Sequence, residues 1–470
     1  MKGFTKKGGN RLKNTRKMMT LFLITTCIMS ILLSACGNST KTTDEPKPTT
    51  EAAVDDNKTE PATENNAEGT AASNEPVTIK FMTPWGGEEV RIRLADALEK
   101  KYPHIKIEHI SAFASAEKIQ EANAANNSPD IMLITDPFVT LHDLEMTYPL
   151  DDLVTKNNVD LTKFRDGAID AIRQRDPEQK NRLLGMPLED VVVNLFYNKD
   201  IFDKLGIEYP SETPTWDEVL DMAAKIAGKH GDGEYVGLAT RGLSQAMLQL
   251  SASGTNPETG EILFEKDPKF AQYFNLIQRV VSIPGNVPDE AQKDNFGFEK
   301  GNVGMILSFV NSAKLYAHTE GLNFGMSAYP SWSDLPGVLP NNIPLTLAIN
   351  PASKHIDEAF KVLEFAVSEE NQKNIAIGGA PPVVKDPEIR KYLAGEDKVG
   401  VYNIDVAYKG TAAAPVFSPY GPDIFYYEAN IIDDKTAEMI KNKGKEDVNT
   451  FLRKMSDEYA AKLKEKANKQ

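Results

Sequence analysis

The residue types that most often do chemistry in proteins form no catalytic or metal-binding motif in this sequence. The chain of 470 residues has six histidines, and none pairs with another at a spacing that builds a zinc site. It contains no Gly-x-Ser-x-Gly nucleophile elbow and no phosphate-binding Gly-x-x-x-x-Gly-Lys-Ser/Thr loop. The 68 aspartate and glutamate residues leave carboxylate pairs suited to glycoside hydrolysis possible. The sequence therefore predicts a protein that is not an enzyme and that uses no metal or cofactor.

Cys36 is the one cysteine with a predicted modification. It ends the sequence Leu-Ser-Ala-Cys, which follows an uncharged apolar run over residues 18–33. Seven Lys and Arg residues and no acidic residue precede that run, and this order of segments is typical of a secretory signal peptide. A cysteine after Leu-x-Ala resembles the bacterial lipobox. We therefore expect residues 1–35 to be a signal peptide and Cys36 to carry a lipid such as palmitate.

A single transmembrane helix is the alternative interpretation of the apolar run, which lies at the short end of what spans a bilayer. The Leu-Ser-Ala-Cys ending favours the lipoprotein. That interpretation locates the mature chain at the extracellular face of the cytoplasmic membrane, held there by its lipid anchor.

The charge balance argues against nucleic acid or an anionic membrane surface as a partner. The net charge is −15, and removal of the seven basic residues of the signal peptide takes it to −22. Both kinds of partner need concentrated positive charge. With Cys27 removed and Cys36 acylated, the folded part has no disulfide, so a large apolar core must stabilise it.

The composition changes sharply at Val77. Residues 37–76 are rich in Thr, Glu, Asn, Ala and Pro and contain no aromatic residue. Such a stretch cannot bury enough apolar surface to offset the entropy of ordering. We therefore assign residues 36–76 to the lipidated cysteine and a disordered linker.

Strand and helix patterns alternate after that point. The segments 77–81 and 105–108 alternate apolar and polar residues, and 131–134 is a continuous apolar run typical of a strand buried on both faces. A capping box at Thr215 predicts a helix to about residue 227. Apolar stripes predict further helices over 356–367 and 448–463. These patterns indicate an α/β protein, and about 390 residues are too many for one core.

Several segments, in order, resemble the family 1 extracellular solute-binding proteins, the receptors of ABC importers related to maltose- and oligosaccharide-binding proteins. The strongest is Phe-Tyr-Asn-Lys-Asp-Ile-Phe at 196–202. The Phe-Glu-Lys-Gly-Asn-Val-Gly-Met segment at 298–305 matches the family's Phe-x-x-Gly-x-x-Ala-Met. The other segments that carry the resemblance are 77–87, 127–134, 148–153, 185–187, 204–206, 213–218, 324–326, 352–355 and 365–372.

The resemblance implies a two-lobe periplasmic-binding-protein type II fold, each lobe a mostly parallel sheet flanked by helices, with hinge crossovers between the lobes. It implies a first lobe of residues 77–189 plus 328–377 and a second of 194–326 plus 380–470. It also implies a monomer that binds a small polar solute, an oligosaccharide by preference, in the cleft between the lobes. The closed receptor would deliver that solute to the permease subunits of an ABC transporter.

Candidate ligand-binding residues of the first lobe follow its predicted strands. Trp85 follows the first strand, where the family has a cleft loop, although it could simply pack in a turn. Asp136 and Phe138 follow the strand 131–134, and Asp136 could instead cap a helix. Glu189 and Asp190 lie at the first crossing between lobes, with a solvated acidic pair as the alternative.

Candidates in the second lobe are less strongly indicated. Arg241 and Gln245 flank a loop that enters a helix. Many sugar-binding relatives have a tryptophan where this chain has Asn311, so Phe309 or Trp332 could supply the missing ring. An aromatic-rich stretch adds Tyr420, which could equally pack in the core. Two other functions stay open: a surface lipoprotein enzyme acting on glycans, and a receptor that feeds a membrane sensor kinase.

Overall fold

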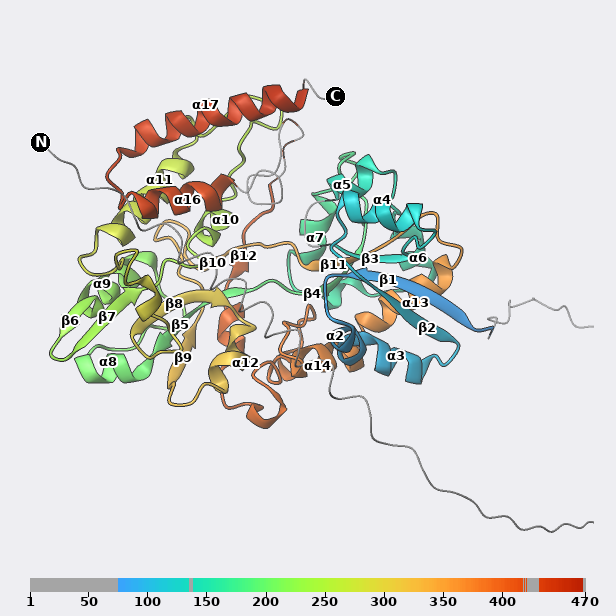
Figure 1. Ribbon diagram of the computed structural model, residues 1–470, viewed down its shortest axis with the longest axis horizontal. Coiled ribbons are helices and arrows are strands. Elements are labelled where there is room, and N and C mark those ends of the chain that lie inside the picture. Colours follow the sequence, from blue (N-terminus) through green and yellow to red (C-terminus); the bar gives the residue numbers. More distant parts are fainter. Residues whose placement is uncertain (1–74, 135–137, 417, 419, 421–430, 468–470) are drawn as a thin grey trace, which may run out of the picture. The chain divides into compact units, whose positions relative to one another are not determined.

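The computed structural model describes residues 75–134, 138–416, 418, 420 and 431–467 (Figure 1). Cys36, the predicted signal peptide and linker, and Asp136 lie outside the described residues. The described chain forms two five-stranded sheets, each with helices packed against it. Two large apolar cores surround the two sheets, and a smaller third cluster lies beside the second sheet.

The first sheet has the strand order β2-β1-β3-β11-β4. Its strands are β1 (Val77–Thr83), β2 (Ile105–Ser111), β3 (Ile131–Ile134), β4 (Met186–Glu189) and β11 (Leu345–Ile349). All four residues of β3 are buried, as the continuous apolar run predicted. Gly185, just before β4, lies so close to β11 that a side-chain carbon there would meet the Leu347 carbonyl oxygen at 2.8 Å. The glycine of the Gly-Met-Pro segment therefore permits this strand pairing.

Helices cover both faces of the first sheet. Figure 1 shows α3 and α13 on one face and α4 and α5 on the other. The helical segments of this part are α2 (Gly87–Val90), the π turn η1 (Arg91–Ala95), α3 (Asp96–Lys101), α4 (Ala116–Ala124), α5 (Val139–Asp143), α6 (Asp151–Lys156), η2 (Leu161–Lys163), α7 (Ala168–Arg173), α13 (Ile356–Ala366), α14 (Glu369–Ile377) and α15 (Pro387–Arg390).

The second sheet has the order β6-β7-β8-β5-β9. Its strands are β5 (Val193–Asn198), β6 (Gly228–His230), β7 (Gly233–Leu238), β8 (Val303–Phe309) and β9 (Phe324–Ser327). Its helical segments are α8 (Lys199–Leu205), α9 (Trp216–Ile226), α10 (Gln245–Gln249), α11 (Pro268–Ser282), η3 (Lys293–Asn295), α12 (Ser312–Ala317), η4 (Glu396–Lys398), η5 (Ile404–Tyr408), α16 (Ile431–Lys441) and α17 (Val448–Ala467). A short ladder joins β10 (Val338–Leu339) to β12 (Thr411–Ala412).

Three predicted helices are confirmed with their causes. Thr215 and Glu218 form the reciprocal capping box that starts α9, which ends at Ile226. In α13 and α17 the predicted apolar stripes are buried, except that Ile356 at the start of α13 and Leu463 near the end of α17 are only partly covered. None of the helices in the described residues is both long and apolar enough to span a membrane.

The expected fold class is confirmed, and the structure adds that both sheets contain antiparallel strands. β11 runs antiparallel to β3 and β4, and β5 runs antiparallel to β8 and β9. A strand that returns to its own sheet through a helix is constrained to run parallel. β5 and β11 instead enter their sheets from the other one, so that constraint does not apply to them.

The cores suggest lobe boundaries that differ slightly from the expected ones. Tyr329 and Trp332 pack in the second core, and the stretch from Ala380 to Ile389 packs in the first. We therefore propose that the second crossing lies between Trp332 and Ile343 and the third just after Ile389.

Asp176 stabilises a loop of the first lobe and provides a test of this packing. Its buried carboxylate accepts hydrogen bonds from the Arg182 guanidinium and from the backbone N–H groups of Glu178, Lys180 and Arg182. Burial alone would raise its pKa, but these hydrogen bonds outweigh burial and lower the pKa from 3.8 to about 2. The carboxylate therefore adds stability above about pH 4, and this contribution is lost as the pH falls towards 2.

We predict that Asp176→Asn lowers the free energy of unfolding by about 1–3 kcal/mol at pH 7. The difference from the unchanged protein should shrink as the pH is lowered from 7 to 3, measured by urea unfolding. Asp143→Asn, at an exposed position, is the control. A loss that is the same at every pH would contradict the assignment.

Candidate ligand-binding site

In each of the two sheets, several strands have their carboxyl ends near the chain crossings, the segments that connect one lobe to the other. β1, β2, β3 and β4 all run in one direction, because β11 lies antiparallel to both β3 and β4. β4 leads directly into β5 of the second sheet. In that sheet the carboxyl end of β8 pairs with the first residue of β5 (Phe309 with Val193), and β7 runs parallel to β8. Loops that follow β1, β2, β3, β7 and β8 therefore flank the crossing, the usual place for a ligand in α/β sheets.

Trp85 is held at this edge by an arginine. The Arg93 guanidinium carbon lies 4.7 Å from the centre of the Trp85 ring, over its face. Arg93 is fixed in turn by the carboxylates of Glu89 (2.5 Å) and Glu189 (2.6 Å). A second contact is edge-to-face with Phe81, at 6.3 Å between ring centres. Trp85 is thus partly buried and rigidly oriented at the wall of the crossing.

Glu189 lies inside the protein rather than in solvent. Its side chain is 5% exposed, and burial raises the pKa of its carboxyl group, while the nearby Arg93 opposes that rise. Its partner Arg93 belongs to η1, which follows Trp85 by only a few residues. Glu189 therefore ties the end of β4 to the Trp85 loop, and the alternative of a solvated acidic pair is wrong.

Asp190 is tied to a different element. Its side chain is fully buried and its carboxylate binds the Arg165 Nε at 2.7 Å. Arg165 also donates to the carbonyl oxygens of Asp166 and Asn342 and to the Asn341 Oδ1 atom. One guanidinium thus joins the first crossing, at Asp190, to the second crossing, at Asn341 and Asn342.

The second-lobe candidates lie at the matching edge. Phe309, the last residue of β8, is 38% exposed, and Asn311 precedes α12 at an exposed position. Arg241 is exposed and lines a groove of about 1070 Å³ with residues of α16. Gln245 begins α10, and its buried Oε1 has no hydrogen-bond partner among the described residues.

Three other candidates lie elsewhere. Phe138 is 1% exposed in the first core, and Trp332 lies in the second core with its N–H donated to the Ala246 carbonyl oxygen at 3.2 Å. Neither side chain has surface left for a ligand, so we remove both from the candidate set. Phe309 and Trp332 were the two residues proposed to replace the tryptophan of the sugar-binding relatives. Of these two, only Phe309 has an exposed ring. Tyr420 is half exposed and donates its hydroxyl hydrogen to the Glu258 carbonyl oxygen.

Phe113 was missed by the sequence analysis. It is 62% exposed and follows β2 by two residues, as Trp85 follows β1 by two. Thr83 and Ser111 are paired across these parallel strands, so both aromatic residues lie at the same sheet edge. An aromatic residue directly after a predicted strand was the available signal.

Comparison with known proteins agrees with this geometry. The model of the family described as bacterial extracellular solute-binding protein matches residues 88–373, more than half of the chain. The chain belongs to this family. A similar curated protein of Sinorhizobium fredii, a probable amino-acid ABC transporter periplasmic-binding protein, is 25% identical over 248 residues. That match covers 48% of this chain and 55% of the relative, so the chain spans about half the length of that relative.

Two solved structures resemble this family member over most of its length. A sugar transporter of Rhizobium etli in an open conformation gives a TM-score of 0.65 at 20% identity, covering 82% of this chain and 99% of that one. The sugar-binding protein MalE of Xanthomonas citri gives 0.64 at 20% identity, covering 83% and 98%. These matches confirm the two-lobe periplasmic-binding-protein type II fold.

The side chains at the sheet edges of this solute-binding protein suit the binding of a polar solute. Within the part of the chain that the structure describes, no group of three or more His, Cys, Asp or Glu side chains could hold a metal ion. The groups at the sheet edges are aromatic faces, amides and arginines, which can stack on a solute and donate or accept hydrogen bonds.

The contacts of Arg165 with Asp190 and with the Asn341–Asn342 segment give a testable prediction. Arg165→Met leaves the Asp190 carboxylate buried without its cation, which should lower the free energy of unfolding by about 3–5 kcal/mol. Arg279→Met, which removes an exposed ion pair with Asp217, should cost less than about 1 kcal/mol. Urea unfolding of the three proteins measures both effects. Equal losses in the two variants would show that Arg165 does not hold the crossings together.

Proposed function

We propose that this protein is a membrane-tethered receptor that captures an oligosaccharide between its two lobes and delivers it to an ABC permease without altering it. The observation that carries the proposal is the pair of aromatic side chains at one sheet edge, Trp85 and Phe113. Arg93 covers one face of the Trp85 ring, and we infer that a sugar ring stacks on the part of this partly buried side chain that stays accessible.

The polar groups around these rings support the same ligand class. Gln245 offers a buried acceptor that has no partner in the described part of the chain, and a ligand hydroxyl group would remove the cost of that unmade hydrogen bond. Arg241 and Asn311 offer donors at exposed positions on the opposite edge. A solute that contacts both edges favours the closed arrangement of the lobes.

The names of similar proteins support transport as the purpose of binding. They include a sugar transporter, a sugar-binding protein and a periplasmic-binding protein of an amino-acid ABC transporter. The last of these makes an amino acid the competing ligand class.

The test is calorimetric titration of the purified protein with a library of neutral oligosaccharides and, in parallel, the common amino acids. Saturable heat with an oligosaccharide, and no new product by chromatography, supports the proposal. Saturable heat only with amino acids would overturn the ligand class, and turnover of a glycan would overturn the receptor function.

Trp85→Ala should weaken binding of that oligosaccharide at least tenfold, about 1.4 kcal/mol, because a stacking surface is lost. Tyr209→Ala is the matched control, since Tyr209 is an exposed aromatic residue beyond α8, at the end of β5 away from the crossing.

The chain has three tryptophans, and Trp216 and Trp332 are buried in the second core. The ligand-induced change in tryptophan emission should therefore disappear in Trp85→Phe. Unchanged affinity in Trp85→Ala would remove this residue from the site.

Lipid attachment is tested in cells. We expect Cys36→Ala to move the protein from the membrane fraction to the soluble fraction, because no acyl chain then anchors it. Cys27→Ala, which changes the other cysteine of the chain, should leave the protein in the membrane fraction. Membrane retention of the Cys36 variant, detected by immunoblotting, would rule out this anchor.

A further inference from the structure

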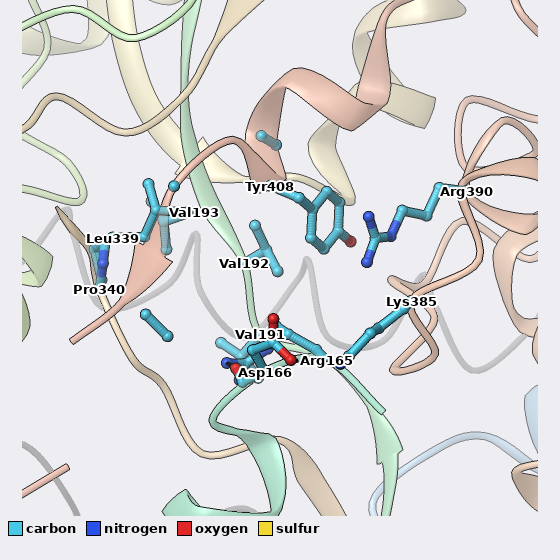
Figure 2. Close-up of a pocket in the computed structure, with 13 residues that line it drawn as sticks. Arg165, Asp166, Val191, Val192, Val193, Leu339, Pro340, Lys385, Arg390 and Tyr408 are labelled. Atoms are coloured by element: carbon cyan, nitrogen blue, oxygen red, sulfur yellow. Dashed lines mark hydrogen bonds and ion pairs between the residues drawn. The ribbon is translucent and has the colours of Figure 1, made fainter. Parts of the chain in front are cut away.

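A second pocket lies behind the crossings, on the side away from Trp85. Its volume is about 230 Å³, and it is lined by the crossing residues Val191 to Val193 and by side chains from both lobes (Figure 2). Arg165 and Lys385 come from the first lobe, and Tyr408 comes from η5 beside the second sheet. None of the predicted ligand-binding residues lines it.

Strand geometry separates this pocket from the candidate site. Glu189 and Asp190 are successive residues of one extended segment, so their side chains point to opposite sides. Glu189 meets Arg93 on the Trp85 side, and Asp190 meets Arg165 on the pocket side. Beyond β4, the edge strand of its sheet, Pro382 bridges to Glu189, and the chain continues to Lys385 in the pocket wall.

Two buried donors in this pocket have no acceptor within the ranges that the structure describes. Arg390 is 7% exposed, and its Nε has no hydrogen-bond partner among the described residues; the same holds for the buried Tyr408 hydroxyl group. The two groups are adjacent, since the Arg390 guanidinium carbon lies 3.7 Å from the centre of the Tyr408 ring. Figure 2 shows the end of the Arg390 side chain beside the Tyr408 hydroxyl group. Each buried donor left unpaired costs free energy.

The charged side chains around the pocket are already paired to different degrees. Three cationic side chains line it, Arg165, Lys385 and Arg390, and their carboxylate partners are Asp190, Asp166 and Asp405 in that order. Arg165 is fully engaged by Asp190 and the Asn341–Asn342 segment, so it serves the hinge.

The other two cations have weaker partners. Lys385 pairs with Asp166 at 2.5 Å, but both side chains are largely exposed, and such a pair contributes little. Arg390 pairs with Asp405 at 2.8 Å, and the Asp405 side chain is half exposed. Lys385 and Arg390 can therefore each accept a second anionic partner.

We propose that this pocket binds a small oxyanion, a phosphate or a carboxylate, through the Arg390 Nε, the Tyr408 hydroxyl group and the Lys385 ammonium group. An oxyanion has several acceptor oxygens and can satisfy both unpaired donors at once. The volume exceeds many times the roughly 10–15 Å³ that one water needs, so a small organic anion fits as well as a phosphate ion.

The experiment is calorimetric titration of the purified full-length protein, without any solute for the cleft, with inorganic phosphate and separately with citrate. Sodium chloride at matched ionic strength is the blank. Saturable heat and a raised melting temperature with either anion are expected, because a ligand of the folded state stabilises it. Saturable heat with phosphate alone, or with citrate alone, shows whether the pocket takes a phosphate or a carboxylate. Saturable heat with neither, as for a pocket that holds only water, overturns the proposal.

Variants locate the binding. Tyr408→Phe keeps the ring on Arg390 and should weaken anion binding about fivefold, the effect of one hydrogen bond. Arg390→Gln should abolish it. Tyr209→Phe and Arg279→Gln, which change exposed residues of the same types, should have no effect.

Trp85→Ala separates this proposal from the receptor function. It should leave anion binding unchanged, because Trp85 lies on the other side of the crossing. Equal binding in Tyr408→Phe and the unchanged protein, or loss of anion binding in Trp85→Ala, would each place the anion elsewhere and overturn the proposal.

Discussion

The buried ion pair between Arg165 and Asp190 is the interaction on which the relation between the two lobes depends. A buried carboxylate is costly unless a cation and further hydrogen bonds compensate it. Here the compensation comes from a guanidinium that also binds Asn341 and the Asn342 carbonyl oxygen, so that two crossings are held at the same point. Only Val191 and Val192 then lie between this fixed point and β5 of the second sheet. We propose that any rotation of one lobe against the other is concentrated in these few residues, as in a hinge.

Successive side chains of an extended segment point in opposite directions, so Glu189 and Asp190 contact different parts of the first lobe on the two sides of the crossing. Glu189 faces the loop that holds Trp85, and its neighbour Asp190 faces the pocket that contains Tyr408. Each acid is neutralised by an arginine of the first lobe, and each arginine has a second task. Arg93 orients an aromatic ring, and Arg165 joins two crossings. If Trp85 contacts the ligand as we propose, a substitution in this segment affects both ligand recognition and the joint between the crossings, because the two acids are adjacent in sequence.

Local patterns predicted the elements, and long-range pairing decided what lies at the site. β1, β2 and β3 and the helices α9, α13 and α17 follow from alternation, capping and apolar stripes, which each depend on a few neighbouring residues. The family and its two-lobe fold were predicted from a different signal, the resemblance of segments such as 196–202 and 298–305 to the solute-binding proteins. The partners of Glu189 and Asp190 are 96 and 25 residues away, and no local period specifies them. Burial was equally hard to foresee: Trp332 and Trp85 were both candidate ligand-binding residues, yet Trp332 packs in the second core and Trp85 lies partly buried at a sheet edge.

The position of the second pocket, behind the crossings, has a thermodynamic consequence for the receptor. Its walls belong to both lobes, so a rotation that brings Trp85 towards Arg241 must also move Tyr408 and Ala412 relative to Arg165 and Lys385. An oxyanion in the second pocket would then bind the open and the closed arrangement of the lobes with different affinities. A solute in the cleft would do the same. Linkage makes the effect of each ligand on the other equal in size. Under this mechanism the hinge is a second binding surface, through which the anion content of the medium sets the affinity of the receptor for its solute.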